Sequence, residues 1–308
     1  MDPRLVLTLT STERAHEKVL EFCQLYYSLR KSNPERVLLN DFSGLDFPAK
    51  PGWIDGLLKH QRVFDDDYVV FKYLQDPDAT FLDVGANWGY SAGGLITLGI
   101  KAKIVSFEVV PMFESVLARL KELYPNQYHF FISGLGDAPA KLTFVVPVVN
   151  GQANFALCSA SEDPGLVALA KNILNHVARL SGGTIDKAEI SFFEFEAPIS
   201  TLDCFIPERL PQSFRNPVEA IKIDVEGLEA SVLKGAVRLI RKHRPLILAE
   251  GANRRKEMQE LMLELGYVFA ERSGEQLEIY AGPGKHTNGF FVHRDRQDHY
   301  RHLGVLKN

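Results

Sequence analysis

Residues 80–99 form the stretch that most constrains the fold of this chain. A short apolar run, with Asp83 near its end, leads into a glycine-containing loop and then into apolar residues at helical spacing. Gly85 and Gly89 allow the loop backbone to turn sharply and to approach a ligand closely, and Gly99 stands where a helix would stop. The stretch therefore predicts a strand, a tight loop and a helix. In open α/β sheets, ligands bind just outside the carboxyl end of such a strand.

A second acid supports a nucleotide-like ligand. Another apolar run ends in Glu108, about twenty residues beyond the loop, where an acid is placed to hold the hydroxyls of a ribose. The dinucleotide fingerprint needs two more glycines, but this chain has Asn87 and Tyr90 there, so a pyrophosphate lacks a close cradle. The pattern fits a cofactor with an amino-acid tail, whose amino group Asp83 would approach directly or through water. The alternative is a structural turn in which Asp83 caps the helix.

Three sequence blocks, in this order, resemble the FkbM family of class I S-adenosylmethionine (SAM) methyltransferases. FLDVGANWGY at residues 81–90 is similar to the first motif of class I enzymes, and SFEVVP at residues 106–111 is similar to the second. IKIDVEGLEASVLKG at residues 221–235, preceded by STLD at residues 200–203, resembles the FkbM signature. The similarity covers about residues 68–295, which is most of the chain. It implies that SAM is the cofactor.

Strand and helix patterns alternate through this region, which predicts a doubly wound, Rossmann-like α/β fold with helices on both faces of a mostly parallel sheet. The resemblance implies seven strands and a reversed strand at the sheet edge. We expect a helical N-terminal extension or cap over residues 1–67, the methyltransferase domain over residues 68–295, and a charged, frayed tail over residues 296–308. Residues 31–52 read as an irregular connector. Residues 150–198 break the alternation with a helix and a strand, and we interpret them as an insertion near the mouth of the site.

The family pattern assigns the cofactor site to the ends of the first three strands. The residues expected to bind SAM are Asp83, Gly85, Asn87, Gly89, Ser91, Glu108, Ser133 and Gly134. Of these, Glu108 would hold the ribose hydroxyls and repel a 2′-phosphate. Ser133 and Gly134 follow the third strand and would line the adenine.

Asp224 and Glu226, which follow the next strand, are the candidate catalytic residues. The sulfonium of SAM already activates the methyl group, so an enzyme must hold the acceptor in line and remove its proton. We expect the two acids to orient the acceptor or take its proton. Ligation of a divalent ion that bridges to the acceptor, and simple helix capping, remain alternatives, and no resident metal is assigned. Glu250 is a further acid at a strand end, and Lys222 could also reach the site, although such a lysine is more often a surface charge.

Composition limits the partners. The chain has 308 residues, a formal net charge of −4 and no strongly basic block, which argues against nucleic acid as the main partner. No apolar stretch approaches the length of a membrane span, and the first residues make a poor signal peptide, so we expect a cytoplasmic protein without a membrane partner. The three cysteines are scattered and lack the spacing of a metal site.

The expected activity is methyl transfer from SAM to a hydroxyl oxygen, with a sugar, polyketide or similar small metabolite as the acceptor that the family implies. Methylation of nucleic-acid amino groups is disfavoured, because DVEG at residues 224–227 replaces the Asn/Asp-Pro-Pro-aromatic signature of those enzymes. Two rivals remain. One is a SAM-binding or interaction module without turnover, and the other is an NAD-dependent oxidoreductase, against which the missing loop glycines count.

Overall fold

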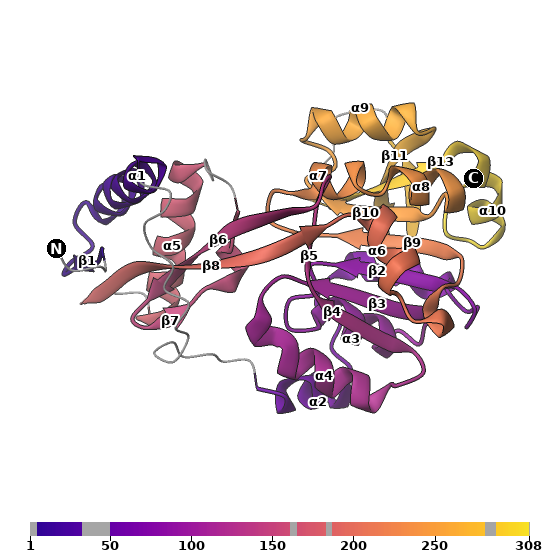
Figure 1. Ribbon diagram of the computed structural model, residues 1–308, viewed down its shortest axis with the longest axis horizontal. Coiled ribbons are helices and arrows are strands. Elements are labelled where there is room, and N and C mark those ends of the chain that lie inside the picture. The colour runs from indigo at the N-terminus through magenta and orange to yellow at the C-terminus, as the bar shows by residue number, and fades with distance from the viewer. Residues whose placement is uncertain (1–4, 33–49, 161–164, 183–186, 281–287, 308) are drawn as a thin grey trace. The chain divides into compact units, whose positions relative to one another are not determined.

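The computed structural model describes residues 5–32, 50–160, 165–182, 187–280 and 288–307 (Figure 1). The chain divides into two compact units. The smaller contains residues 1–48 and 141–197, and the larger contains residues 49–140 and 198–308. Most of the predicted connector over residues 31–52 lies outside the described residues. Among the residues that are described, no helix combines the length and apolar character needed to cross a membrane.

The larger unit is built on an eight-stranded sheet with the order β12-β11-β13-β10-β9-β2-β3-β4. The strands are β2 (Thr80–Val84), β3 (Lys103–Glu108), β4 (Tyr128–Ile132), β9 (Val218–Ile223), β10 (Leu246–Glu250), β11 (Tyr267–Ser273), β12 (Gln276–Ile279) and β13 (Asn288–His293). From β4 to β10 all neighbours pair in parallel. Strand order runs outward from β2 in one direction and from β9 in the other, so the topological switch point lies between these two strands.

The Rossmann-like α/β fold with a mostly parallel sheet is confirmed, with two differences from the expected sheet. The described residues form eight strands in this sheet and not seven, because β12 forms a hairpin with β11 and becomes the edge strand. The reversed strand β13 lies one position inside the β11–β12 hairpin, antiparallel to both β10 and β11. Its residues Phe290, Phe291 and Val292 are all buried, so both faces of β13 are covered. A strand covered on both faces suits an interior position better than an edge.

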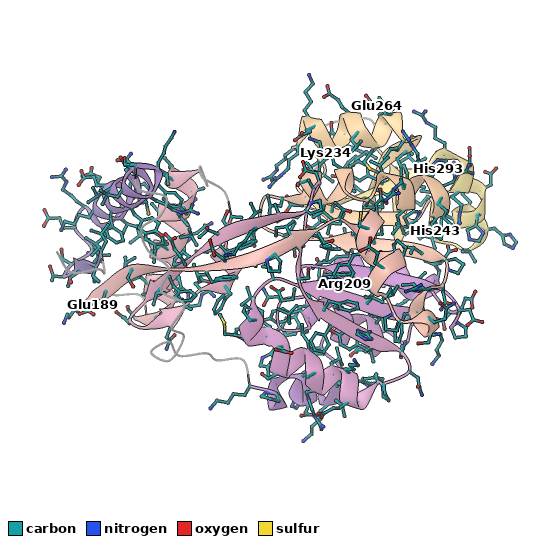
Figure 2. All side chains as sticks on the ribbon, in the orientation of Figure 1. Glu189, Arg209, Lys234, His243, Glu264 and His293 are labelled. Atoms are coloured by element: carbon teal, nitrogen blue, oxygen red, sulfur yellow. The ribbon has the colours of Figure 1, made fainter. Side chains whose placement is uncertain are left out.

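Helices cover both faces of the sheet. One face carries α2 (Gly52–Lys59), η1 (Asp66–Tyr73), α3 (Tyr90–Thr97), η2 (Pro111–Phe113), α4 (Glu114–Leu123), η5 (Arg294–Arg296) and α10 (Gln297–His302), and the other carries α6 (Leu202–Arg209), η4 (Gln212–Phe214), α7 (Glu229–Lys234), α8 (Val237–His243) and α9 (Lys256–Glu264). Successive strand residues point to opposite faces, so Phe81 packs in one core and Leu82 in the other. Charged side chains such as Lys234 and Glu264 lie on the exposed sides of the covering helices (Figure 2).

The smaller unit has a hydrophobic core of its own. Its helices α1 (Ala15–Ser32) and α5 (Leu166–Leu180) pack together beside the sheet β1-β8-β6-β7. The strands are β1 (Leu7–Leu9), β6 (Ala140–Val149), β7 (Gln152–Ala153) and β8 (Ala188–Ser200), with η3 (Phe155–Leu157) between β7 and α5. The last two residues of β8, Ile199 and Ser200, belong to the larger unit, where they pair with β5 (Gly134–Leu135). The helix and strand expected between residues 150 and 198 therefore form, and they share a core with the N-terminal helix.

The tail predicted over residues 296–308 is not frayed in its described part, which ends at Lys307. It continues from η5 into α10, and Leu306 then forms a parallel bridge with Leu277 of β12. Tyr300 and Val305 are buried among the residues of the first core. The prediction was wrong because the charges dominate the sequence of this segment, whereas its few apolar residues decide where it lies.

Tyr300→Ala is expected to lower the free energy of unfolding by about 3–5 kcal/mol, as for other buried aromatic residues, because it leaves a cavity under α10. Leu303→Ala, at the end of the same helix, removes a side chain that is 42% exposed, and should change stability by about 0.5 kcal/mol or less. Urea denaturation of both variants checks this. Equal midpoints for Tyr300→Ala and the wild type would show that the segment is not part of the core.

Candidate active site

Four segments lie at the carboxyl ends of the parallel strands in the larger unit. They are the loop after β2, the end of β3, the loop after β9 and the end of β10, and they carry the predicted residues from Asp83 to Glu108 together with Asp224 and Glu226. Because β2 and β9 are adjacent at the switch point, parallel pairing brings their carboxyl ends together. The sequence-predicted cofactor loop and the predicted catalytic acids therefore lie side by side.

The loop after β2 contacts the loop after β9 at Gly85. This glycine has φ +84°, and a Cβ atom there would lie 1.8 Å from the carbonyl oxygen of Asp224. The backbone N–H of Asp224 donates to the carbonyl oxygen of Val84 at 3.0 Å. Glycine is thus required at position 85 because the β9 loop packs against it, in addition to the sharp turn that the sequence suggested.

Asn87 and Glu108 close the other side of the loop. Asn87 has φ +51°, a left-handed conformation that asparagine tolerates better than most residues. Its backbone N–H donates to Oε2 of Glu108 at 2.6 Å, and the Val110 N–H donates to Oε1 at 2.8 Å. Burial raises the pKa of Glu108, and these backbone donors oppose the shift. Each carboxylate oxygen keeps a second lone pair, so Glu108 retains acceptor capacity for a pair of hydroxyls.

Asp83 points into the sheet. Its side chain is fully buried between two cross-strand neighbours, Ser106 of β3 and Lys222 of β9. The Ser106 hydroxyl donates to Oδ2 at 2.7 Å, and Lys222 Nζ lies 3.5 Å from Oδ1. Oδ1 accepts no hydrogen bond among the described residues, but the carboxylate is fully buried and lies beside Lys222. This burial favours an indirect role for Asp83 over direct contact with an amino group of the cofactor.

Lys222 is not a surface charge. Its side chain is 5% exposed, and Nζ donates to the Gly85 carbonyl oxygen at 2.6 Å and lies 3.7 Å from Oδ2 of Asp224. Burial acts to lower the pKa of Lys222, but the negative charges of Asp224 and Asp83 outweigh it and the pKa is raised. Lys222 therefore stays protonated and links the cofactor loop to the predicted catalytic acids.

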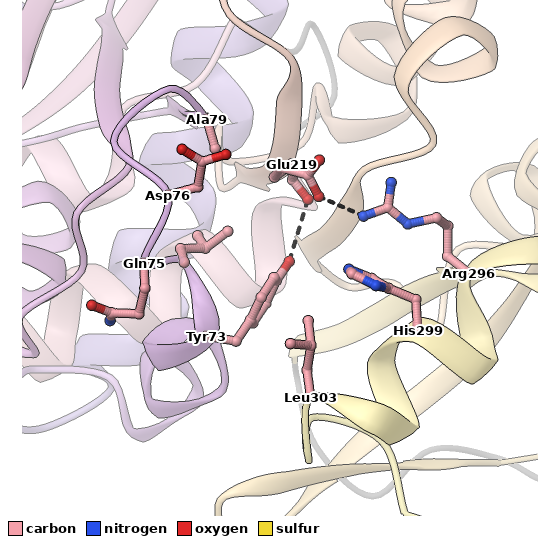
Figure 3. Close-up of a pocket in the computed structure, with 9 residues that line it drawn as sticks. Tyr73, Gln75, Asp76, Ala79, Glu219, Arg296, His299 and Leu303 are labelled. Carbon is pink, nitrogen blue, oxygen red and sulfur yellow. Dashed lines mark hydrogen bonds and ion pairs between the residues drawn. The ribbon is translucent and has the colours of Figure 1, made fainter.

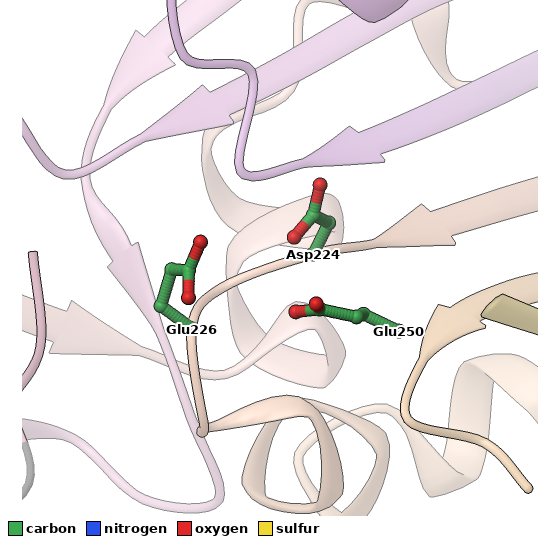
Figure 4. Close-up of side chains that lie close together, drawn as sticks. All are labelled: Asp224, Glu226 and Glu250. Carbon is green, nitrogen blue, oxygen red and sulfur yellow. The ribbon is translucent and has the colours of Figure 1, made fainter. Parts of the chain in front are cut away.

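The catalytic acids are joined by a third carboxylate. Asp224, Glu226 and Glu250 each place a carboxylate oxygen within 4.8 Å of the others (Figure 4). Glu226 has φ +51° and is followed by Gly227 with φ +115°, so the backbone turns sharply just beyond β9. A left-handed conformation at a non-glycine residue is costly, and such strain is concentrated at functional sites. Glu250 is the strand-end acid that the predicted catalytic pair did not include.

The crowding of these acids changes their proton affinity. Desolvation and the negative charges of Glu250 and Asp224 raise the pKa of Glu226 to about 8. Desolvation and Asp224 likewise raise the pKa of Glu250 to about 7. Three carboxylates this close repel one another unless a proton or a cation lies among them. The cluster is suited to proton transfer near neutral pH, and its oxygen ligands are also those that Mg²⁺ and Mn²⁺ prefer.

The remaining predicted residues lie nearby but are less open. Ser91, in the first turn of α3, is buried, and its hydroxyl has no hydrogen-bond partner among the described residues. The Ser133 N–H donates to the Glu108 carbonyl oxygen at 2.8 Å. Gly134 is covered by Ile199, whose Cδ1 would lie 2.3 Å from a Cβ there. Lining of the adenine by Ser133 and Gly134 stays a prediction.

A cavity of about 570 Å³ lies at the amino ends of the parallel strands, near the start of β9 (Figure 3). Its polar lining includes the half-buried ion pair of Arg296 with Glu219, at 2.5 Å, beside His299. Tyr73 donates from its hydroxyl to the Glu219 carbonyl oxygen at 3.3 Å. Because Glu219 is at the amino end of β9 and Asp224 follows its carboxyl end, this cavity is separate from the candidate site.

The family model described as the Methyltransferase FkbM domain matches residues 83–269. No curated protein shows significant sequence similarity to the chain.

Among solved structures, the methyltransferase FkbM from Methylobacillus flagellatus KT is similar at 13% identity and a TM-score of 0.40, over 88% of this chain and 70% of that one. The SAM-dependent methyltransferase from Aquifex aeolicus is similar at 12% identity and a TM-score of 0.34, over 80% and 98%. The O-methyltransferase from Bacillus cereus in complex with SAH is similar at 10% identity and a TM-score of 0.34, over 88% and 100%.

Lys222→Met is expected to lower the free energy of unfolding by about 3–5 kcal/mol, because it leaves Asp83 buried without its counter-charge. Lys234→Met is the matched control. Its side chain is 43% exposed and pairs with Glu257 at the surface, where an ion pair contributes about 1 kcal/mol or less. Urea midpoints measure both. A Lys222→Met midpoint no lower than that of the control would contradict the buried ion pair.

Proposed function

The chain belongs to the FkbM family of SAM-dependent methyltransferases, and we propose that it methylates a hydroxyl oxygen of a small metabolite such as a sugar or a polyketide. The observation that carries this proposal is the carboxylate cluster of Asp224, Glu226 and Glu250 beside the cofactor loop. A hydroxyl acceptor has a high pKa and must lose its proton during transfer. A carboxylate with a raised pKa is suited to receive it.

The residues around the glycine loop fit SAM. Glu108 has acceptor capacity for the ribose hydroxyls, and the Gly85 and Gly89 backbone, both with positive φ, leaves the loop without side chains at these two points. The described loop presents no close cradle of three glycines for a pyrophosphate, which counts against NAD. When bound, SAM supplies a methyl group already activated by its sulfonium. The contacts of Gly85, Asn87, Gly89, Ser91 and Glu108 with it are part of the proposal.

Within the cluster we assign two roles. Glu226, with its pKa raised to about 8, takes the proton from the acceptor hydroxyl, a step that typically contributes about 10²–10⁴-fold to the rate. Asp224, fixed by Lys222 and by its contact with Gly85, orients the acceptor. An acid near the sulfonium stabilises the charged ground state, so electrostatic attraction to SAM alone would not accelerate transfer. The proposed gain comes from the acceptor side.

A divalent cation is a second possibility for the same cluster. The oxygens of the three carboxylates lie close enough to ligate one ion, which would hold and acidify the acceptor hydroxyl. A SAM-binding module without turnover is the alternative outside enzymes. Absence of a nucleic-acid partner and a cytoplasmic location, both expected from the sequence, stay predictions.

Glu108→Ala is expected to weaken SAM binding about tenfold or more, which corresponds to about 1.4 kcal/mol, because charge-assisted contacts to the ribose are lost. Isothermal titration calorimetry with SAM measures the effect. Glu122→Ala on the exposed side of α4 is the control and should bind like the wild type. If Glu108→Ala binds SAM as tightly as the wild type and neither protein binds NAD, Glu108 is not part of the cofactor site.

A screen of hydroxylated metabolites with methyl-labelled SAM tests the activity itself. We expect label in the product, and turnover that rises with pH through about 7 to about 8, because Glu226 and Glu250 act only after losing their protons. Glu226→Gln should abolish that rise and most of the turnover, while SAM affinity is kept.

Three outcomes separate the alternatives. SAM binding without label transfer to any acceptor would support a non-catalytic module. Loss of activity with EDTA, restored by Mg²⁺ or Mn²⁺, would assign the cluster to a metal ion. Full activity in Glu226→Gln would remove Glu226 from proton transfer, and the exposed Glu260→Gln on α9 serves as the charge-matched control.

A further inference from the structure

Glu229 is a buried acid in the first turn of α7, close to the site but not part of it. Its side chain is fully buried, and Oε1 accepts hydrogen bonds from the N–H groups of Val225 at 3.2 Å and Gly227 at 3.0 Å. These two residues flank Glu226. The backbone on both sides of Glu226 is therefore bound to the buried carboxylate of Glu229.

Arg255 compensates the charge of Glu229 and reaches the same loop. Its Nη1 lies 3.0 Å from Oε2 of Glu229 and donates to the Gly227 carbonyl oxygen at 2.8 Å. Arg255 belongs to the segment between α9 and β10, and Glu250 is the last residue of β10. A Cβ at Gly251 would lie 3.0 Å from Nε of Arg255, so the guanidinium packs back against its own loop. One side chain thus contacts both loops that supply the carboxylate cluster.

We propose that Glu229 and Arg255 form a positioning pair that holds Glu226 and Glu250 in the arrangement needed for turnover, without touching SAM or the acceptor. The proposal rests on the proton transfer assigned above to Glu226 and on the carboxylate cluster that Glu250 completes.

Two physical arguments support this role. The left-handed backbone of Glu226 is strained and persists only where its surroundings over-determine it, and the hydrogen bonds on either side of it go to Glu229. The cofactor loop, by contrast, packs on Asp224 through Gly85. Loss of the pair should therefore disturb the acceptor side of the site and leave SAM binding intact.

Arg255→Met tests the pair directly. We expect kcat to fall by about 10²-fold, the size of effect that a misplacement of about 1 Å produces, with an unchanged dissociation constant for SAM in calorimetry. Arg255→Lys keeps the positive charge and should recover part of the loss. Arg254→Met, at the exposed neighbouring position, is the matched control and should match the wild type in kcat, KM and SAM affinity.

A second variant covers the case in which Arg255→Met unfolds because Glu229 is left uncompensated. Glu229→Leu with Arg255→Met removes both charges and the acceptor of the Val225 and Gly227 N–H groups. It leaves no unpaired buried ion, so it should fold. We expect its kcat to stay low and its crystal structure to show Glu226 and Glu250 displaced from each other relative to the wild type.

The outcomes separate this inference from the proposed function. Wild-type kcat in the folded double variant, or an equal loss of SAM affinity and kcat, would overturn the positioning role, while inactivity of Glu226→Gln still upheld the proposed function. A wild-type protein that binds SAM but transfers no methyl group to any acceptor would overturn both.

Discussion

The site depends on one buried ammonium group, that of Lys222. It lies between β2 and β9, the two strands at the switch point, and its contacts run to Asp83 on one side, to Asp224 on the other and to the Gly85 carbonyl oxygen above. A buried charge is tolerated only where it is paired, so β2, β9 and the loop after β2 must place their polar groups within reach of one ammonium group. The position of the cofactor loop relative to the predicted catalytic acids is therefore fixed by this charge pairing as well as by sheet pairing.

Parts of the site were predictable because their signals are local. The glycine loop after Asp83 and the acid Glu108 follow from residue type and spacing along a single βα unit, and Asp224 and Glu226 follow from a strand-end motif. The mostly parallel sheet follows from the alternation of strand and helix patterns. These features depend on neighbours within about twenty residues, which is the range over which sequence patterns are informative.

Other parts were not predictable, because their partners are distant in the chain. Nothing local indicates that Lys222 pairs with Asp83, or that Arg255 reaches Glu229, since both pairs depend on which strands and loops are adjacent. The prediction for the segment around Tyr300 was wrong for the same reason, because nothing in its mostly charged sequence indicates that Tyr300 is buried. Which strand lies at the edge of the sheet likewise depends on the pairing of β12 with β11, and tertiary packing determines that pairing.

The charges of the site are divided between two kinds of carboxylate. Asp83 and Glu229 are fully buried, and each is compensated by one cation, Lys222 or Arg255. Lys222 also lies 3.7 Å from Asp224, but desolvation and the neighbouring charges of Glu250 and Asp224 still raise the pKa of Glu226 to about 8. If the cations instead neutralised the cluster, its carboxylates would be weaker bases and less able to remove a hydroxyl proton. The two cations also bind backbone, Lys222 at the Gly85 carbonyl oxygen and Arg255 at the Gly227 carbonyl oxygen. The buried pairs therefore fix the loops on which the carboxylates of the cluster are held close together.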